Sequence, residues 1–464
     1  MFVQHFFPTL AFLSVFLGTV LAAECTNITI VTADHADRIR KSCKTITGYL
    51  NFDGSLNETI NLDGIETVDG NMMYYPDDDW PIAWESDEPY PTDRSTFKIH
   101  SSTLKTINGD VYLWKFQGLE ELSFPNLTRV EQGFGLRRMR YLKTLDITNL
   151  AYLGDFNIEA TQLTTLRHEG LKGFTNSTHK YHQIEMHGLR VESIDSWFRY
   201  PLTVDWVIPQ FAAEPESAPA PINIYGYSLP NIKNVTIGWS KISNVKIRGD
   251  FDVTFGGSET EEVEIDFLLI YGNTTKIQRD PDLKKLEVGE LIVTHSFAKE
   301  VDLSALDQVT NLTFTFNQGL QGVRVGPKAT EWENVSVVFD FNENVNLTSE
   351  YRDPENEKDR FWYWPEGEMR SIVITGTPVT NDFFESFLEH RNGSDAPKVS
   401  YQFDLQPEWY EQSIIDCTPF EELRNRSVLP EYYGCKDKES SANITRLSWA
   451  FTAVAFLINA LHFL

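Results

Sequence analysis

The sequence predicts a mainly β protein that folds as a right-handed parallel β-solenoid with a disulfide-capped end on each side. A ten-residue frame recurs at residues 43–52, 65–74 and 104–113, each time with glycine in its sixth position. A second pattern, five apolar residues spaced 3, 2, 3 and 3, begins at Leu119 and again 23 residues later at Leu142. Self-similarity with a period of about 20–50 residues is typical of repeat architectures.

Each repeat contributes a strand with one buried face. Apolar and polar residues alternate in the frame, as they do around Ile107 and Val111, and this period of two is that of a half-buried strand. Gly48, Gly70 and Gly109 fall on the inward side, where we expect them to let a neighbouring backbone approach; a plain turn is the alternative. One such strand cannot bury its face alone, so successive repeats should stack into a parallel sheet.

An acidic, aromatic and proline-rich insertion, residues 76–95, separates the second frame from the third. It cannot form a regular repeat, so we expect a projecting loop. Its aromatic side chains could stack on sugar rings while its carboxylates bond hydroxyl groups; a solvated insertion is the alternative. The candidate glycan-contacting residues are Trp80, Trp84 and Tyr90.

A proline- and alanine-rich stretch, residues 209–221, is the clearest break in composition and predicts a linker or long loop. It would separate a first lobe, residues 23–208, from a second lobe, residues 222–436. The 3, 2, 3 spacing resumes at Leu283, residues 371–376 resemble the last strand, and residues 381–390 have helical spacing. Two lobes of similar design are predicted, with one continuous solenoid as the alternative.

Both ends of the chain carry processing signals. Residues 6–23 are apolar with a small-residue exit at 20–22, which predicts a secretory signal peptide over residues 1–22, with a transmembrane anchor as the alternative. Residues 437–464 combine small residues, a short polar spacer and an apolar tail, which predicts a GPI-attachment signal with Ser440 or Ser441 as the attachment residue. A transmembrane helix in the tail is the competing interpretation.

Charge and cysteine usage agree with an extracellular protein. The 464-residue chain has 67 acidic and 40 basic side chains, a formal net charge of −27, which argues against nucleic acid as a partner because phosphate binding needs a basic surface. We expect the disulfides Cys25–Cys43 and Cys417–Cys435, because each pair lies at one end of the repeats, where the terminal repeat has an open apolar face.

Twelve N-x-S/T sequons occur, whereas chance at this composition would give only about four. The excess predicts a secreted glycoprotein with surface glycans. Asn443 lies beyond the predicted anchor site, and the other eleven sequon residues are Asn27, Asn57, Asn126, Asn176, Asn234, Asn273, Asn311, Asn334, Asn346, Asn392 and Asn425.

Both ends of the repeat region carry a family resemblance. Cys25 with Cys-Lys-Thr-Ile-Thr-Gly at 43–48, and Cys-Thr-Pro-Phe at 417–420 with Tyr432, Tyr433 and Cys435, resemble fungal GPI-anchored wall proteins of the extracellular-mutant family and its sporulation-specific relatives. The resemblance implies leucine-rich-repeat-like receptor L-domain coils and a non-enzymatic role in cell-wall organisation, at the plasma membrane or in the wall. The chain departs from the family in lacking a serine-rich stretch before the attachment site and in its acidic insertion.

No catalytic motif stands out. The sequence lacks G-x-S-x-G, P-loop, H-E-x-x-H and EF-hand patterns. The best metal candidate is a histidine-rich stretch that we expect to be an exposed loop, and we predict neither a metal nor another cofactor. Its residues are His179, His182, Glu185 and His187, with His168 nearby.

The sequence therefore predicts a GPI-anchored surface glycoprotein that is not an enzyme and that contacts wall polysaccharides or other wall proteins. A glycan-binding receptor module is the first alternative. A wall-remodelling enzyme with carboxylates on one sheet face is the second.

Overall fold

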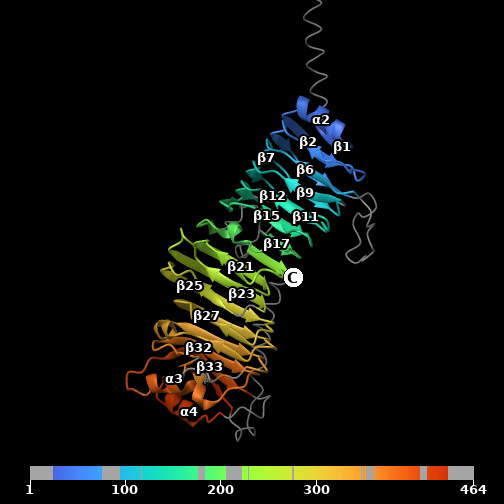
Figure 1. The fold of residues 1–464 in the computed structure, drawn as a ribbon. Coiled ribbons are helices and arrows are strands. Elements are labelled where there is room, and N and C mark those ends of the chain that lie inside the picture. The colour runs from blue at the N-terminus through green and yellow to red at the C-terminus, as the bar shows by residue number, and fades with distance from the viewer. Residues whose placement is uncertain are drawn as a thin grey trace, which may run out of the picture.

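The computed structural model describes residues 25–75, 95–116, 118–175, 183–204, 222–227, 229–273, 276–345, 347, 350–351, 359–360, 362–407 and 415–436. The molecule is elongated, and successive strands lie across its long axis (Figure 1). No helix in these described ranges is long and apolar enough to cross a membrane. The predicted signal peptide and attachment signal, Ser440 and Ser441 included, lie outside the described residues.

A 22-stranded sheet, called here the main sheet, extends along the described part of the molecule, and its strand pairs are parallel. In the first half it contains β1 (Thr26–Ile30), β2 (Thr45–Phe52), β4 (Thr67–Asp69), β5 (Met72–Tyr74), β7 (Thr106–Ile107), β8 (Val111–Trp114), β10 (Arg129–Val130), β11 (Gly133–Arg137), β13 (Tyr152–Leu153), β14 (Asp155–Glu159), β16 (Gly173–Phe174), β17 (Gln183–His187), β18 (Thr203–Val204) and β19 (Ile222–Tyr227). In the second half it contains β21 (Lys241–Gly249), β23 (Glu262–Gly272), β25 (Lys285–Thr294), β27 (Gln308–Thr315), β29 (Val335–Asp340), β32 (Met369–Thr375), β33 (Val399–Gln406) and β34 (Tyr432–Cys435).

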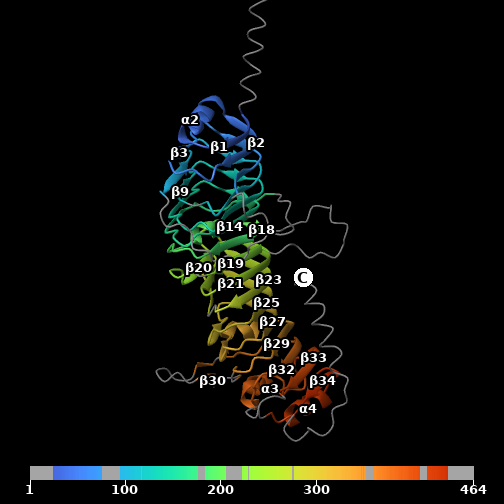
Figure 2. The same cartoon turned by 90° about the vertical axis from the view of Figure 1, so that its right-hand side faces the viewer.

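Shorter parallel sheets form the opposite side of the molecule (Figure 2). The first comprises β3 (Ile60–Asn61), β6 (Phe97–His100), β9 (Leu119–Ser123), β12 (Thr144–Asp146) and β15 (Thr165–Arg167). The others are β20 (Asn234–Ile237), β22 (Asp252–Phe255) and β24 (Ile277–Arg279), then β26 (Glu300–Asp302) and β28 (Gly322–Arg324). A separate antiparallel pair is β30 (Glu350–Tyr351) and β31 (Asp359–Arg360).

The register of the main sheet explains the sequence period. Val111 of β8 pairs with Phe134 of β11, which pairs with Phe156 of β14. Each step is 22 or 23 residues, so equivalent apolar residues stack in rows, and these three are fully buried. The core between the main sheet and the shorter sheets therefore consists of continuous rows of aliphatic and aromatic side chains.

The glycine positions of the repeated frame permit close backbone contact. A Cβ atom at Gly70 would lie 1.8 Å from the carbonyl oxygen of Gly48, and one at Gly109 would lie 2.7 Å from that of Gly70. The expected close backbone approach is therefore confirmed between Gly48 and Gly70 and between Gly70 and Gly109. However, Gly70 and Gly109 lie at bends between two short strands, not inside one strand, because β4 ends before Gly70 and β7 before Gly109.

The main sheet continues past the predicted boundary between the lobes. Gln183 of β17 pairs with Asn223 of β19, and Asn223 pairs with Lys246 of β21. The opposite side is interrupted there, because the five-stranded sheet ends at β15 and a three-stranded sheet begins at β20. The linker at 209–221 and the acidic insertion at 76–94 lie outside the described residues.

Helices lie at the two ends of the molecule (Figures 1 and 2), and each end also has a disulfide. Near the first end lies α2 (Ala33–Ser42), with Thr32 as its N-cap, and the disulfide Cys25–Cys43 joins β1 to the helix C-terminus. Near the other lie η3 (Asn381–Phe384), α3 (Glu385–His390) and α4 (Thr418–Asn425), and the disulfide Cys417–Cys435 joins α4 to β34. The two predicted disulfides and the helical segment at 381–390 are confirmed. Two further 3-10 helices, η1 (Asp195–Phe198) and η2 (Pro327–Glu331), lie between the two ends.

The sequence predicted that residues 371–376 form the last strand. This prediction is wrong. Residues 371–375 belong to β32, which is followed by β33 and β34 in the same sheet. The apolar spacing of β33 and β34 is hard to recognise in the sequence, because charged and aromatic residues occupy their outward positions. Tyr401 and Tyr432 are examples, with exposed fractions of 55% and 71%.

Candidate functional site

The most promising surface is the outward side of β8, β11, β14 and β17. The register places Tyr112, Gly135, Asn157 and Glu185 side by side, one from each strand. We call these four residues the Tyr112 row. Neighbouring strands lie about 4.8 Å apart and cross the long axis of the molecule, so the row runs along that axis.

The aromatic end of the row is closely packed. The rings of Tyr112 and Tyr75 stack with centroids 5.0 Å apart. On the other side, a Cβ atom added to Gly135 would lie 2.9 Å from the Tyr112 ring, so the glycine makes room for it. Burial first, and then the neighbouring Tyr112 and Asp110, raise the pKa of Tyr75 to about 12. Its hydroxyl therefore stays protonated at neutral pH.

The polar end of the row is a hydrogen-bonded cluster. The Nε2 atom of His187 lies 2.6 Å from Oε1 of Glu185, and Nδ2 of Asn157 donates to the other oxygen of the same carboxylate. Burial opposes ionisation of Glu185, but the bond to His187, the charges of His187 and Arg137 and the bond from Asn157 outweigh it and lower its pKa. The cluster thus holds a fixed carboxylate whose side chain is 18% exposed.

The proposed histidine-rich loop is in part a strand. Glu185 and His187 lie on β17 and point to the same side, two residues apart, because the alternating residues Ile184 and Met186 are buried. His179 and His182 lie outside the described residues. Within the described ranges, no group of three or more His, Cys, Asp or Glu side chains is placed to hold a metal ion.

His168 lies in the core, away from Glu185. Its ring stacks on Trp197 with centroids 3.8 Å apart, its Nε2 atom lies 2.8 Å from the Leu150 carbonyl oxygen, and Nδ1 accepts the Gly170 N–H. These two bonds fit the neutral ring with its proton on Nε2. Burial lowers the pKa to about 4, although the bond to Leu150 acts in the opposite direction.

This buried histidine predicts a pH-dependent stability. Between its ordinary pKa of 6.5 and about 4, the unfolded chain takes up a proton at His168 that the folded chain does not. Stability at this site is therefore present above pH 6.5 and lost as the pH falls, by roughly 3 kcal/mol in total. Urea unfolding at several pH values should show a smaller loss in His168→Gln than in the wild type. Equal losses would assign the effect to other groups.

A second row of rings lies at the ends of the strands in the second half. Tyr271, His295, Phe316 and Phe341 follow one another at centroid distances of 5.1, 5.9 and 5.4 Å. The Arg248 guanidinium covers Tyr271, and Phe341 lies against Gly376. Because the ring faces are used within this stack, they are not available to a flat ligand. We interpret the row as structural.

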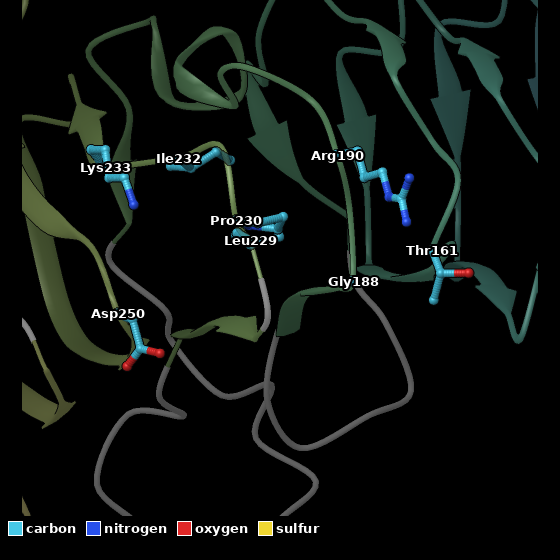
Figure 3. Close-up of a pocket in the computed structure, with 8 residues that line it drawn as sticks. All are labelled: Thr161, Gly188, Arg190, Leu229, Pro230, Ile232, Lys233 and Asp250. Carbon is cyan, nitrogen blue, oxygen red and sulfur yellow. The ribbon is translucent and has the colours of Figure 1, made fainter.

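A pocket of about 440 Å³ lies where the five-stranded sheet gives way to the three-stranded one. In Figure 3, Arg190 and Thr161 lie on one side and Lys233 and Asp250 on the other, with Leu229 and Pro230 between them. The two cations do not converge on a common point. The pocket therefore does not form a site for one small anion.

The described sequon residues lie on the surface. Asn27, Asn57, Asn126, Asn273, Asn334, Asn392 and Asn425 are exposed, and Asn234 and Asn311 are half-buried. Asn176 and Asn346, together with the candidate sugar-contacting residues Trp80, Trp84 and Tyr90, lie outside the described residues.

Sequence reasoning missed the Tyr112 row. The repeats were aligned on their inward apolar residues, and the outward residues between them were read only as polar. Applying the 22- or 23-residue step to Tyr112 leads to Gly135 and Asn157, so the signal was present. The next step, to Glu185, is 28 residues and could not be found without the register.

Comparisons with family models, curated proteins and solved structures found no match to this chain.

Proposed function

We propose that the chain is a GPI-anchored surface glycoprotein that supports the organisation and integrity of a fungal cell wall without catalysing a reaction. One observation carries the proposal. A single parallel sheet extends from β1, which follows Cys25, to β34, which ends at Cys435. A body of this kind transmits force and holds its surface in a fixed shape, as a scaffold must.

The fold proposed for this scaffold is a right-handed parallel solenoid of leucine-rich-repeat-like receptor L-domain coils. The parallel register with steps of 22 or 23 residues supports it, and so do the helix and disulfide at each end. The continuous main sheet favours one stack, and the interruption between β15 and β20 marks where two lobes would meet.

The partners we propose are wall polysaccharides or other wall proteins, with a GPI anchor on Ser440 or Ser441 holding the protein at the outer face of the plasma membrane. The net charge of −27 argues against nucleic acid as a partner, because phosphate binding needs a basic surface. The surface positions of the described sequon residues support residence outside the cell.

The test combines anchorage with phenotype. Phosphatidylinositol-specific phospholipase C should release the protein from intact membranes, and deletion should make cells sensitive to wall-perturbing dyes. Ser440→Leu combined with Ser441→Leu should prevent release by removing the small attachment residue. Retention on membranes after treatment, together with normal wall-stress growth of the deletion strain, would contradict the proposal.

A glycan-binding receptor module is the second candidate. It is favoured by the acidic, aromatic insertion at 76–95, whose Trp80, Trp84 and Tyr90 side chains could stack on sugar rings. The two candidates differ in the role of glycan binding. In the receptor module, glycan binding is itself the function. In the scaffold, it only attaches the protein to the wall.

A further inference from the structure

We infer that the N-glycans on Asn27 and Asn273 are held against the protein surface, with the first N-acetylglucosamine of each packed on an exposed aromatic side chain of the next repeat. These aromatic residues are Tyr49 for Asn27 and Phe297 for Asn273. The inference deepens the proposed function, on which it rests because only a secreted chain receives such glycans. It gives two of the predicted glycans a fixed place on the fold.

The same contact occurs at both sequons. The Oδ1 atom of Asn27 accepts the backbone N–H of Tyr49, and Oδ1 of Asn273 accepts that of Phe297, each with a donor–acceptor distance of 3.2 Å. The partners are 22 and 24 residues apart, which is one repeat in each case. Because the N–Cα bond is about 1.5 Å long, the Cα atom of each aromatic residue lies within about 5 Å of the amide oxygen. Each aromatic side chain therefore starts next to the glycan attachment point.

Both aromatic side chains have an accessible ring. The exposed fractions of Phe297 and Tyr49 are 65% and 38%, which makes them two of the few large apolar residues exposed in the described ranges. The rings of the second row stack on one another, whereas no ring contact joins Phe297 or Tyr49 to another aromatic residue in the part of the chain that the structure describes. The C–H groups of a sugar pack favourably on an aromatic face of this kind.

The amide of Asn273 is oriented so that its sugar begins on the side of Phe297. Its Nδ2 atom donates to Asp250 of the preceding repeat at 2.9 Å, while its Oδ1 atom faces Phe297 of the following repeat. A carboxylate only accepts and a backbone N–H only donates, so these two contacts fix which atom of the amide is which.

A glycosylated amide keeps both contacts. Transfer from a lipid-linked oligosaccharide pyrophosphate breaks the C1–O bond to the pyrophosphate, forms the Nδ2–C1 bond and releases one of the two Nδ2 protons. The product is a planar trans amide like a peptide bond, in which C=O and N–H point in opposite directions. The remaining N–H can thus still donate to Asp250, and C1 lies on the same side of the C–N bond as Oδ1, toward Phe297.

The backbone sets the Asn27 amide in place. The register between β1 and β2 shifts at Asn27, which has a φ of +51°, a left-handed conformation that asparagine adopts more readily than most residues. A Cβ atom at Gly48 would overlap Oδ1 of Asn27, so the glycine makes room for the amide. Since Asn27 and Tyr49 are both exposed, the sugar is attached at the surface beside the ring.

The test measures how fast peptide N-glycosidase F releases each glycan from the folded full-length protein, produced in a secreting eukaryotic host and extracted in detergent. The enzyme leaves aspartate at each released site, so peptide mass spectrometry gives a separate rate for every sequon. Release at Asn27 and Asn273 should be roughly fivefold slower than at Asn392, because the sugar must first leave its ring. Asn392 is the matched control, since it is exposed and a Cβ atom at the neighbouring Gly393 meets no atom within 4 Å.

Two substitutions separate the ring contact from general access. Phe297→Ala should speed release at Asn273 about fivefold and leave Asn27 unchanged, and Tyr49→Ala should do the reverse. Each variant is the control for the other, because a folding defect would change both sites.

Equal release rates at the three sequons, or unchanged rates in the two variants, would overturn the inference. So would a lack of glycans on Asn27 and Asn273 in a protein that carries one on Asn392. A lack of glycans on every sequon would contradict the proposed secreted glycoprotein as well, so the two failures can be distinguished.

Discussion

Replacing Gly70 with alanine should destabilise the first half of the molecule by roughly 4 kcal/mol or more, the range seen when a side chain is forced into a backbone contact. The new Cβ atom would lie 1.8 Å from the Gly48 carbonyl oxygen, and Gly70 has a φ of +151°, where L-residues are strained. Side-chain rotation cannot relieve a clash between backbone and Cβ. The bend between β4 and β5 would have to move away from β2.

The matched control is Gly322→Ala. A Cβ atom at Gly322 meets no atom within 4 Å, and its φ is not in the left-handed region. Its effect should stay within about 1 kcal/mol. Secretion yield and the urea midpoint would measure both variants. Similar urea midpoints for the two variants would show that the stability of the sheet does not depend on the close approach at Gly70.

Replacing Asn342 with leucine should cost roughly 4 kcal/mol, because it removes the centre of a buried hydrogen-bonded row. The Asn342 Nδ2 atom donates to the Phe314 and Asp340 carbonyls, and its Oδ1 atom accepts from Nδ2 of Asn317. Asn342 and Asn317 are fully buried. Leucine has the same number of side-chain heavy atoms and a larger volume, so the substitution opens no cavity, and the loss would come from the unsatisfied polar groups and from crowding of the added methyl groups.

Asn344→Ala provides the comparison for this row. Asn344 lies two residues away, is exposed, and donates only to the Gln318 carbonyl. Water can replace that bond, so we expect a change below about 1 kcal/mol. Equal effects of the two substitutions on the urea midpoint would contradict a buried asparagine row as a source of stability.

The inward side of the fold could be predicted from the sequence because apolar spacing records burial directly. The 3, 2, 3 pattern falls on β9 and β12, and the recurring glycines marked the close backbone approach, although they lie at bends and not inside a strand as expected. The disulfides followed from the position of each cysteine pair. In each case the feature can be recognised in a short stretch of sequence, without knowledge of the strand register.

The outward side could not be predicted in the same way. Tyr112 and Glu185 lie 73 residues apart, and only the register of three successive strand pairs brings them into one row. The β14-to-β17 step is longer than the others, so a fixed period misplaces Glu185. The buried asparagine row was missed for a related reason, since Asn317 and Asn342 look like ordinary polar residues at strand ends.

His168 shows that residues close in the sequence need not lie close together in the structure. In the sequence it stands near three other histidines and an acid, which made this stretch the best metal candidate although no metal was predicted. The structure turns its ring into the core against Trp197, while Glu185 and His187 face outward on β17. Sequence proximity was a poor guide because the chain crosses from one side of the molecule to the other between these residues.

The most direct test of the proposed function is retention of the secreted ectodomain, residues 24–439, on insoluble cell-wall fractions, with released sugar assayed in the same tubes. A scaffold that binds wall polymer without chemistry predicts retention of the protein and no release of sugar above that from walls alone. Release of sugar would contradict a non-enzymatic role. Absence of the protein from the wall pellet would contradict polymer binding itself.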